Sequence, residues 1–199
     1  SLALMCLLLL PASQASTEES LPDVRMLIDV SGSMRESDPQ NLRKPALELS
    51  YEEWRRVLYL HLDVAFLLAQ AAAPHMAEAG WGRVLFIGSV TTFTAGGPVP
   101  IPAYTTAKTA LLGLTRALAK EWARLGIRVN LLCPGYVETE FTLPLRQNPE
   151  LYEPITARIP MGRWARPEEI ARVAAVLCGD EAEYLTGQAV AVDGGFLAY

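Results

Sequence analysis

The sequence is poor in cysteine and has no cluster of basic residues, and each shortage excludes a class of function. Among its 199 residues are three cysteines, Cys6, Cys133 and Cys178, without a Cys-x-x-Cys pair. This pattern gives neither a disulfide framework nor a zinc site, and reduced core cysteines are expected. The net charge is −5, so binding to nucleic acid is not expected. With 51% hydrophobic residues, the chain can build a packed core.

No apolar run at the start of the chain reaches the length of a transmembrane helix, so no stable membrane span is expected. The stretch 1–10 is almost wholly apolar but short, and small polar residues follow it in 11–15. This order is typical of a secretory signal, although an initiator methionine and a basic start are missing. We therefore expect a signal-like leader and linker over 1–20, with a buried strand or helix as the alternative.

Predicted strands and helices alternate along the rest of the chain. Apolar runs predict strands near 23–30, 83–88, 127–133 and 188–192, and helical spacing predicts helices near 50–79, 103–125 and 167–178. Ser50 and Glu53 form a capping box that begins the first helix, and Gly80 ends it. The stretch 136–166 is expected to be irregular. This alternation predicts an α/β fold: a truncated Rossmann-like parallel sheet of about four strands with flanking helices, two long ones on one face.

Ser89, Tyr104 and Lys108 carry the clearest chemical signal in the sequence. Tyr104 and Lys108 lie four residues apart on a predicted helix, so their side chains share a face. A free tyrosine has a pKa near ~10, and a neighbouring ammonium group lowers this pKa because it favours the phenolate. Ser89 follows a predicted strand, at the sheet edge where α/β sites form. The three residues predict proton transfer to an alcohol oxygen; an exposed helical pair is the alternative for tyrosine and lysine alone.

The motifs around these residues resemble the short-chain dehydrogenase/reductase family. Tyrosine and lysine stand in Tyr-x-x-x-Lys, Ser89 follows Ile87-Gly88, and a predicted strand ends in Pro134-Gly135. Thr139 stands where the family has a threonine that contacts the nicotinamide carboxamide. Further matches at 162–163, 167–171 and 186–195 extend the resemblance over 44–199.

The resemblance implies hydride transfer between a nicotinamide cofactor and a small carbonyl compound or secondary alcohol. Tyr104 would be the acid/base, Lys108 would tune it and orient the ribose, and Ser89 would polarise the carbonyl. The family usually has a catalytic asparagine at the position of His61. A histidine there could relay protons, and a core histidine is the alternative.

The cofactor implied is NAD or NADP, held by Lys108, Pro134, Gly135 and Thr139 as a partial site. The family begins with a glycine-rich turn that approaches the pyrophosphate, and neither Gly-x-x-x-Gly-x-Gly nor Gly-x-Gly-x-x-Gly occurs in this chain. An acidic residue for the ribose cannot be assigned. We therefore expect weak cofactor binding and no measurable turnover from this chain alone.

A second resemblance lies upstream. A predicted strand ends in Asp29, Ser31 and Ser33, similar to the Asp-x-Ser-x-Ser metal site of von Willebrand factor A domains, and we assign 21–43 to this resemblance. One carboxylate and two hydroxyls suit Mg²⁺, but the set is incomplete, so bound Mg²⁺ is not expected. A polar loop is the alternative interpretation.

The chain is thus interpreted as a mosaic of 1–20, 21–43 and 44–199. Its alternatives are a non-catalytic chimera or remnant and a cation-binding adhesion module. Missing strands would leave a sheet edge and an apolar face uncovered, which predicts a homo-oligomer or aggregation. The dehydrogenase resemblance implies a cytoplasmic protein and the leader an exported one, so the localisation stays open.

Overall fold

Among the residues that the structure describes, four parallel strands form one sheet and follow one another in chain order. The computed structural model describes residues 25–28 and 44–198. The strands are β1 Arg25–Ile28, β2 Gly82–Ile87, β3 Ile127–Pro134 and β4 Ala189–Val192, in the order β1-β2-β3-β4. The predicted α/β fold with a four-stranded parallel sheet is confirmed. The leader at 1–20 lies outside the described residues.

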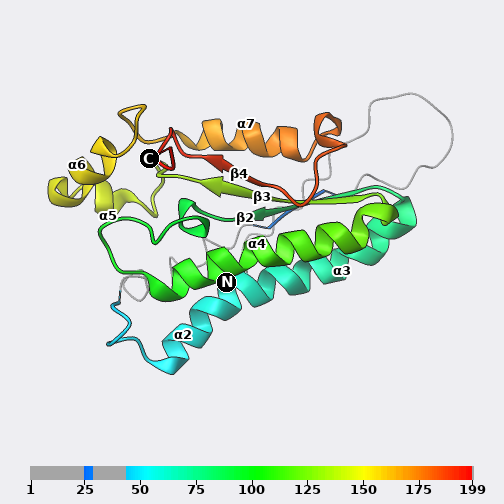
Figure 1. Cartoon of the computed structure of the whole chain (residues 1–199), viewed down its shortest axis with the longest axis horizontal. Helices are drawn as coiled ribbons and strands as arrows, with labels where there is room; N and C mark the ends of the chain where they lie inside the picture. The colour runs from blue at the N-terminus through cyan, green and yellow to red at the C-terminus, as the bar shows by residue number, and fades with distance from the viewer. Residues whose placement is uncertain (1–24, 29–43, 199) are drawn as a thin grey trace.

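Two long helical stretches cover one face of this sheet, and a third helix lies on the other face (Figure 1). The first stretch is continuous through α2 Tyr51–Leu58, η3 Tyr59–Asp63 and α3 Val64–Ala79, and the second is α4 Pro102–Trp122. The helix on the other face is α7 Pro167–Leu177, while α5 Leu143–Arg146 and α6 Pro149–Ala157 lie near the ends of β3 and β4. Short 3₁₀ turns are η4 Val90–Thr92, η5 Ala123–Leu125 and η6 Asp180–Ala182.

The first helical stretch begins and ends where its sequence predicts. The Ser50 hydroxyl accepts a hydrogen bond from the backbone N–H of Glu53 at 3.2 Å, and the Glu53 carboxylate accepts one from the Ser50 N–H at 2.9 Å. Gly80 ends the helix with φ at 65°, a conformation that glycine adopts without strain. By length and apolar composition Tyr51–Ala79 could cross a membrane, but its inner face packs on the sheet.

Small side chains allow α3 to lie close against the sheet. Ala65, Ala69 and Ala72 recur on one face and are buried with Met76 in the main core, which they share with β2, β3 and α4. Gly82 allows the same close approach, because a side-chain carbon there would lie 2.6 Å from the Met76 sulfur. The tight packing fixes the distance between helix and strands, and with it the position of side chains near the strand ends.

The second face of the sheet is covered by α7. Leu85 on β2 and Leu132 on β3 are fully buried, and both pack in a cluster with Leu177 of α7. The prediction of an uncovered apolar face is therefore wrong for the two central strands. β1 is the edge strand among the described residues.

The stretch predicted to be irregular contains two helices. The Asn148 side chain caps α6 by accepting a hydrogen bond from the Glu150 N–H at 3.0 Å, and Pro149 occupies the first turn. Such an Asn-Pro start is a recognised helix signal. The helices are short and Pro154 interrupts the apolar spacing, which is why periodicity did not reveal them.

Candidate active site

Ser89 stands directly after β2, at the sheet edge toward which the arrows of β3 and β4 point in Figure 1. Its hydroxyl accepts a hydrogen bond from the Thr91 N–H at 3.2 Å, and its own N–H donates to the Thr92 hydroxyl at 3.3 Å. The Thr92 hydroxyl in turn donates to the backbone carbonyl of Lys108 at 3.1 Å. These hydrogen bonds connect the turn that carries Ser89 to the backbone of α4.

Gly88 allows β2 and β3 to approach each other just before the serine. A side-chain carbon at Gly88 would lie 2.7 Å from the Cys133 sulfur and 2.9 Å from the Thr92 hydroxyl. Cys133 is fully buried, and burial raises the pKa of its thiol. A buried neutral thiol of this kind is a packing group.

Tyr104 and Lys108 lie on the first half of α4, on the helix face that the sequence predicted. Lys108 is 2% exposed, and its Nζ donates a hydrogen bond to the backbone carbonyl of Ile87 at 2.6 Å. The same Nζ lies 5.5 Å from the centre of the Tyr104 ring. The ammonium group thus lies between the carboxyl end of β2, which precedes Ser89, and the ring of Tyr104.

His61 packs against Tyr104. It lies in the π-helical turn η3, a wider turn of the kind often found at functional sites. Its ring is 5.1 Å from that of Tyr104 with the planes at 86°. His61 is 1% exposed, and neither ring nitrogen has a hydrogen-bond partner among the described residues. Burial, with a smaller effect of Lys108, lowers the pKa of His61 to about 3, so the imidazole is neutral near pH 7.

Pro134 is the last residue of β3, and Gly135 and Thr139 follow it in the segment after the strand. The Gly135 N–H donates to the carbonyl of Val192 at 3.0 Å, and a side chain at Gly135 would meet Asp193, with its first carbon 2.8 Å from the Asp193 Cα. The Thr139 N–H donates to the Thr142 hydroxyl at 3.1 Å. Gly135 and Thr142 line the same cavity as Ser89 and Tyr104, so this segment offers backbone and neutral hydroxyl groups that suit the uncharged amide end of a nicotinamide.

One cavity of about 160 Å³ joins several of these residues. Ser89, Tyr104 and Gly135 line it together with Thr142. Its other walls come from η4 and the loop after it, the segment after β3, and helices α5 and α6. They include Thr91, Gly97, Pro98, Val99, Ile101, Tyr136, Phe141, Leu145 and Ile155. None of these wall residues was predicted as a site residue. The sequence gives a signal for Tyr136 alone, which directly follows the Pro134-Gly135 turn at the end of a strand.

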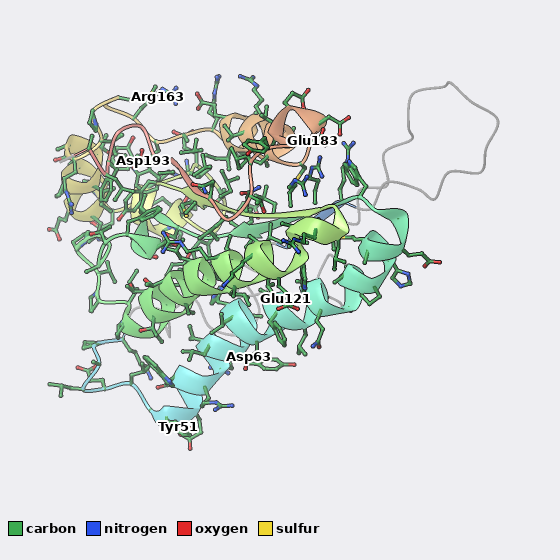
Figure 2. The ribbon with its side chains drawn as sticks, turned by 45° about the vertical axis from the view of Figure 1, so that its right-hand side comes forward. Tyr51, Asp63, Glu121, Arg163, Glu183 and Asp193 are labelled. Carbon is green, nitrogen blue, oxygen red and sulfur yellow. The ribbon has the colours of Figure 1, made fainter. Side chains whose placement is uncertain are left out.

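The C-terminal segment supports this wall. Asp193 lies at the same end of the molecule as Arg163, far from Glu183 (Figure 2). Its carboxylate accepts hydrogen bonds from the N–H groups of Gly195 at 3.0 Å and Leu197 at 2.9 Å. The turn that results carries Phe196 into the cluster behind the cavity.

The structure does not describe the second predicted site. Asp29, Ser31 and Ser33, proposed as metal ligands, fall outside the described residues. Within 25–28 and 44–198 no group of three or more His, Cys, Asp or Glu side chains is arranged to hold a metal ion.

The comparisons with families and curated proteins agree with one another. The family model described as enoyl-(acyl carrier protein) reductase matches residues 12–197. The 2-dehydro-3-deoxy-D-gluconate 5-dehydrogenase of Bacillus subtilis is 40% identical over 156 residues, which cover 78% of this chain and 61% of that protein. The galactitol 2-dehydrogenase (L-tagatose-forming) of Cereibacter sphaeroides is 38% identical over 93% of this chain and 70% of its own length.

Solved structures resemble the chain equally clearly. The TT0495 protein from Thermus thermophilus superposes with a TM-score of 0.79 and 99% identity over 80% of this chain and 66% of its own. A putative NAD(P)-dependent gluconate 5-dehydrogenase from Beutenbergia cavernae, solved with bound NADP, has a TM-score of 0.76 and 47% identity, covering 79% of this chain and 62% of its own. This chain thus spans about two thirds of the length of such proteins.

Proposed function

The chain belongs to the short-chain dehydrogenase/reductase family, and we propose that it transfers hydride between a nicotinamide cofactor and a small carbonyl compound or secondary alcohol. One observation carries this proposal: Ser89 and Tyr104 line the same cavity. Lys108 is held beside the tyrosine ring by its hydrogen bond to the backbone carbonyl of Ile87. We assign the activity to the segment 44–199.

The proposed roles follow from this arrangement. When bound, the nicotinamide supplies the hydride to the substrate carbon or accepts it from that carbon. The Tyr104 hydroxyl gives a proton to the carbonyl oxygen during reduction and takes it back during oxidation. The Ser89 hydroxyl donates a hydrogen bond to the same oxygen, and Lys108 favours the phenolate form of Tyr104. Neutral His61 positions the tyrosine ring, and its ring nitrogens, which have no hydrogen-bond partner in the described part of the chain, offer a path for protons.

For the cofactor we propose NADP or NAD, bound weakly by this chain. NADP is present in solved structures of relatives. Lys108, Pro134, Gly135 and Thr139 would serve the nicotinamide end, whereas the sequence has no glycine-rich loop for the phosphates. Loss of ~4 kcal/mol of binding free energy weakens affinity about a thousandfold. We therefore expect turnover only when the cofactor is supplied at millimolar concentration.

The substrate class and the assembly are also proposals. One named relative acts on a sugar acid and another on the polyol galactitol, which supports a hydroxylated carbonyl substrate. The outer face of α2 to α3 exposes Tyr59, Phe66 and Leu67, which supports pairing of this face in a homo-oligomer.

A steady-state assay tests the proposed activity. The purified chain is supplied with NADPH or NADH at millimolar concentration and with a panel of ketones and hydroxyketones. Oxidation of the cofactor that depends on the ketone and is lost in Tyr104→Phe is expected. Absence of ketone-dependent oxidation with either cofactor at saturation would favour the non-catalytic alternative.

A further inference from the structure

The hydroxyl of Tyr136 lies at the wall of the active-site cavity and has no hydrogen-bond partner among residues 25–28 and 44–198. Tyr136 and Gly97 both line the cavity, and a side chain at Gly97 would overlap the Tyr136 hydroxyl oxygen. The phenol therefore occupies the space that glycine leaves open. Its hydroxyl makes no hydrogen bond to any residue in the described part of the chain. Because half-buried phenols usually have a hydrogen-bond partner, this one is available to a ligand.

The ring of Tyr136 is held in place from behind. It packs 5.0 Å from the Trp164 ring and 5.5 Å from the Phe196 ring, measured between centroids. Trp164 is 1% exposed and Phe196 is 3% exposed. Rotating the phenol out of the cavity would break this cluster, so the hydroxyl is presented at a fixed position. Burial raises the pKa of Tyr136, and the group remains a neutral donor and acceptor near pH 7.

The cavity itself offers no charge to a substrate. Its polar side chains are hydroxyls, from Ser89, Tyr104, Tyr136 and the threonines, and among the described residues that line it none is acidic or basic. A carboxylate brought into such a site loses its hydration without gaining a cation, which is unfavourable. Arg158 lines two neighbouring hollows rather than this cavity, and its guanidinium stacks 4.5 Å from the centre of the Phe196 ring. From there its charge opposes the larger effect of burial, which raises the pKa of Tyr136.

We propose that this cavity selects an uncharged carbonyl compound bearing a hydroxyl group, and that Tyr136 is the residue that recognises this hydroxyl. The inference rests on the proposed function, since Ser89 and Tyr104 hold the reacting oxygen. Tyr136, on the segment after β3, binds the second oxygen. Phe141, Leu145 and Ile155 contact the carbon frame between them.

Three ketones with one carbon frame test the substrate class. They are methyl propyl ketone, the same ketone with a terminal hydroxyl, and levulinate, the same ketone ending in a carboxylate. Binding to the full chain with millimolar NADP is measured by saturation-transfer NMR, and kcat/KM is measured in the reducing direction with millimolar NADPH. The hydroxyketone should bind best and levulinate worst. If no ketone turns over, the proposed function fails, while the binding order still decides this inference.

Variants assign the selectivity to Tyr136. Tyr136→Phe should weaken the hydroxyketone about tenfold, as loss of one hydrogen bond implies, and leave methyl propyl ketone unchanged. Gly97→Ala should have the same selective effect because it displaces the hydroxyl. Tyr152→Phe is the control, since that ring also packs against Trp164, at 5.3 Å between centroids, and does not line the cavity. Levulinate as the best ligand, or equal losses for both neutral ketones in Tyr136→Phe, would overturn the proposal.

Discussion

The imidazole ring of His61 stands edge-on to the phenol ring of Tyr104, with the centroids 5.1 Å apart and the planes at 86°. Lys108 approaches the same phenol, with Nζ 5.5 Å from the ring centre. Because burial lowers the pKa of His61 to about 3, the imidazole carries no charge near pH 7. Of these two neighbours, only the lysine acts on the tyrosine as a cation.

The first prediction concerns stability in acid. The pKa of His61 is about 3 in the folded chain and 6.5 in its unperturbed state, so the unfolded chain binds the extra proton between these values. This contribution to stability is complete above pH 6.5 and is lost as the pH falls toward 3. Between about pH 6.5 and about pH 4.5, the loss should be about 2 kcal/mol. Urea unfolding at both pH values should show a smaller loss in His61→Leu.

His75 provides the control for this experiment, because it is the other histidine of the chain and is exposed. His75→Leu should retain the acid sensitivity of the parent chain. Equal acid sensitivity in His61→Leu and the parent chain would show that His61 is not buried as described.

A second prediction concerns the glycine before the serine. Gly88→Ala should destabilise the fold by about 1–3 kcal/mol, the usual cost of overpacking, because the new methyl group would crowd Cys133 and Thr92. Gly113→Ala is the matched control: it is an exposed helical position with nothing near an added carbon. That change should stabilise the chain by up to about 1 kcal/mol. Thermal unfolding distinguishes the two, and equal effects would contradict the close approach of β2 and β3.

A third prediction tests the covering of the sheet by α7. Leu132 is fully buried beneath this helix, whereas Leu125 is 45% exposed. Leu132→Ala should therefore lower the free energy of unfolding by about 2–5 kcal/mol, and Leu125→Ala by less than about 0.5 kcal/mol. Chemical denaturation measures both. A small effect of Leu132→Ala would mean that this face of the sheet is open.

A fourth prediction concerns cofactor affinity. The chain has no glycine-rich phosphate loop in its sequence, so NADPH should bind with a Kd in the millimolar range, about a thousandfold weaker than micromolar. Titration followed by nicotinamide fluorescence measures this constant. A micromolar Kd would show that other residues of the chain hold the phosphates.

The catalytic candidates could be found from sequence because their geometry is local or follows a general rule. Tyr104 and Lys108 share a helix face by spacing alone, and Ser89 reaches them because strand ends gather at one sheet edge. Tyr136 could not be recognised in this way. Its position depends on Trp164 and Phe196, which lie far away in the chain, and on the absence of a side chain at Gly97.

The charge state of His61 was equally hidden from the sequence. Whether a histidine is neutral depends on its burial, and the burial of His61 arises from packing between α4 and the π-helical turn η3. Helices α5 and α6 were missed because they are short and contain prolines. The charge state of His61 and the two missed helices both concern the surroundings of the active site, whereas the reacting groups Ser89, Tyr104 and Lys108 could be found from the sequence.

The central claim is that Tyr104 supplies the proton for hydride transfer in this cavity. The most direct test is a single-turnover reaction of the chain with NADPH deuterated at the transferred position and a saturating hydroxyketone, followed by mass spectrometry of the product alcohol. We predict that deuterium appears in the product and that Tyr104→Phe slows its appearance about 100-fold or more, without a change in fold or NADPH affinity. Equal rates of deuterium transfer in the parent chain and the variant would contradict the account.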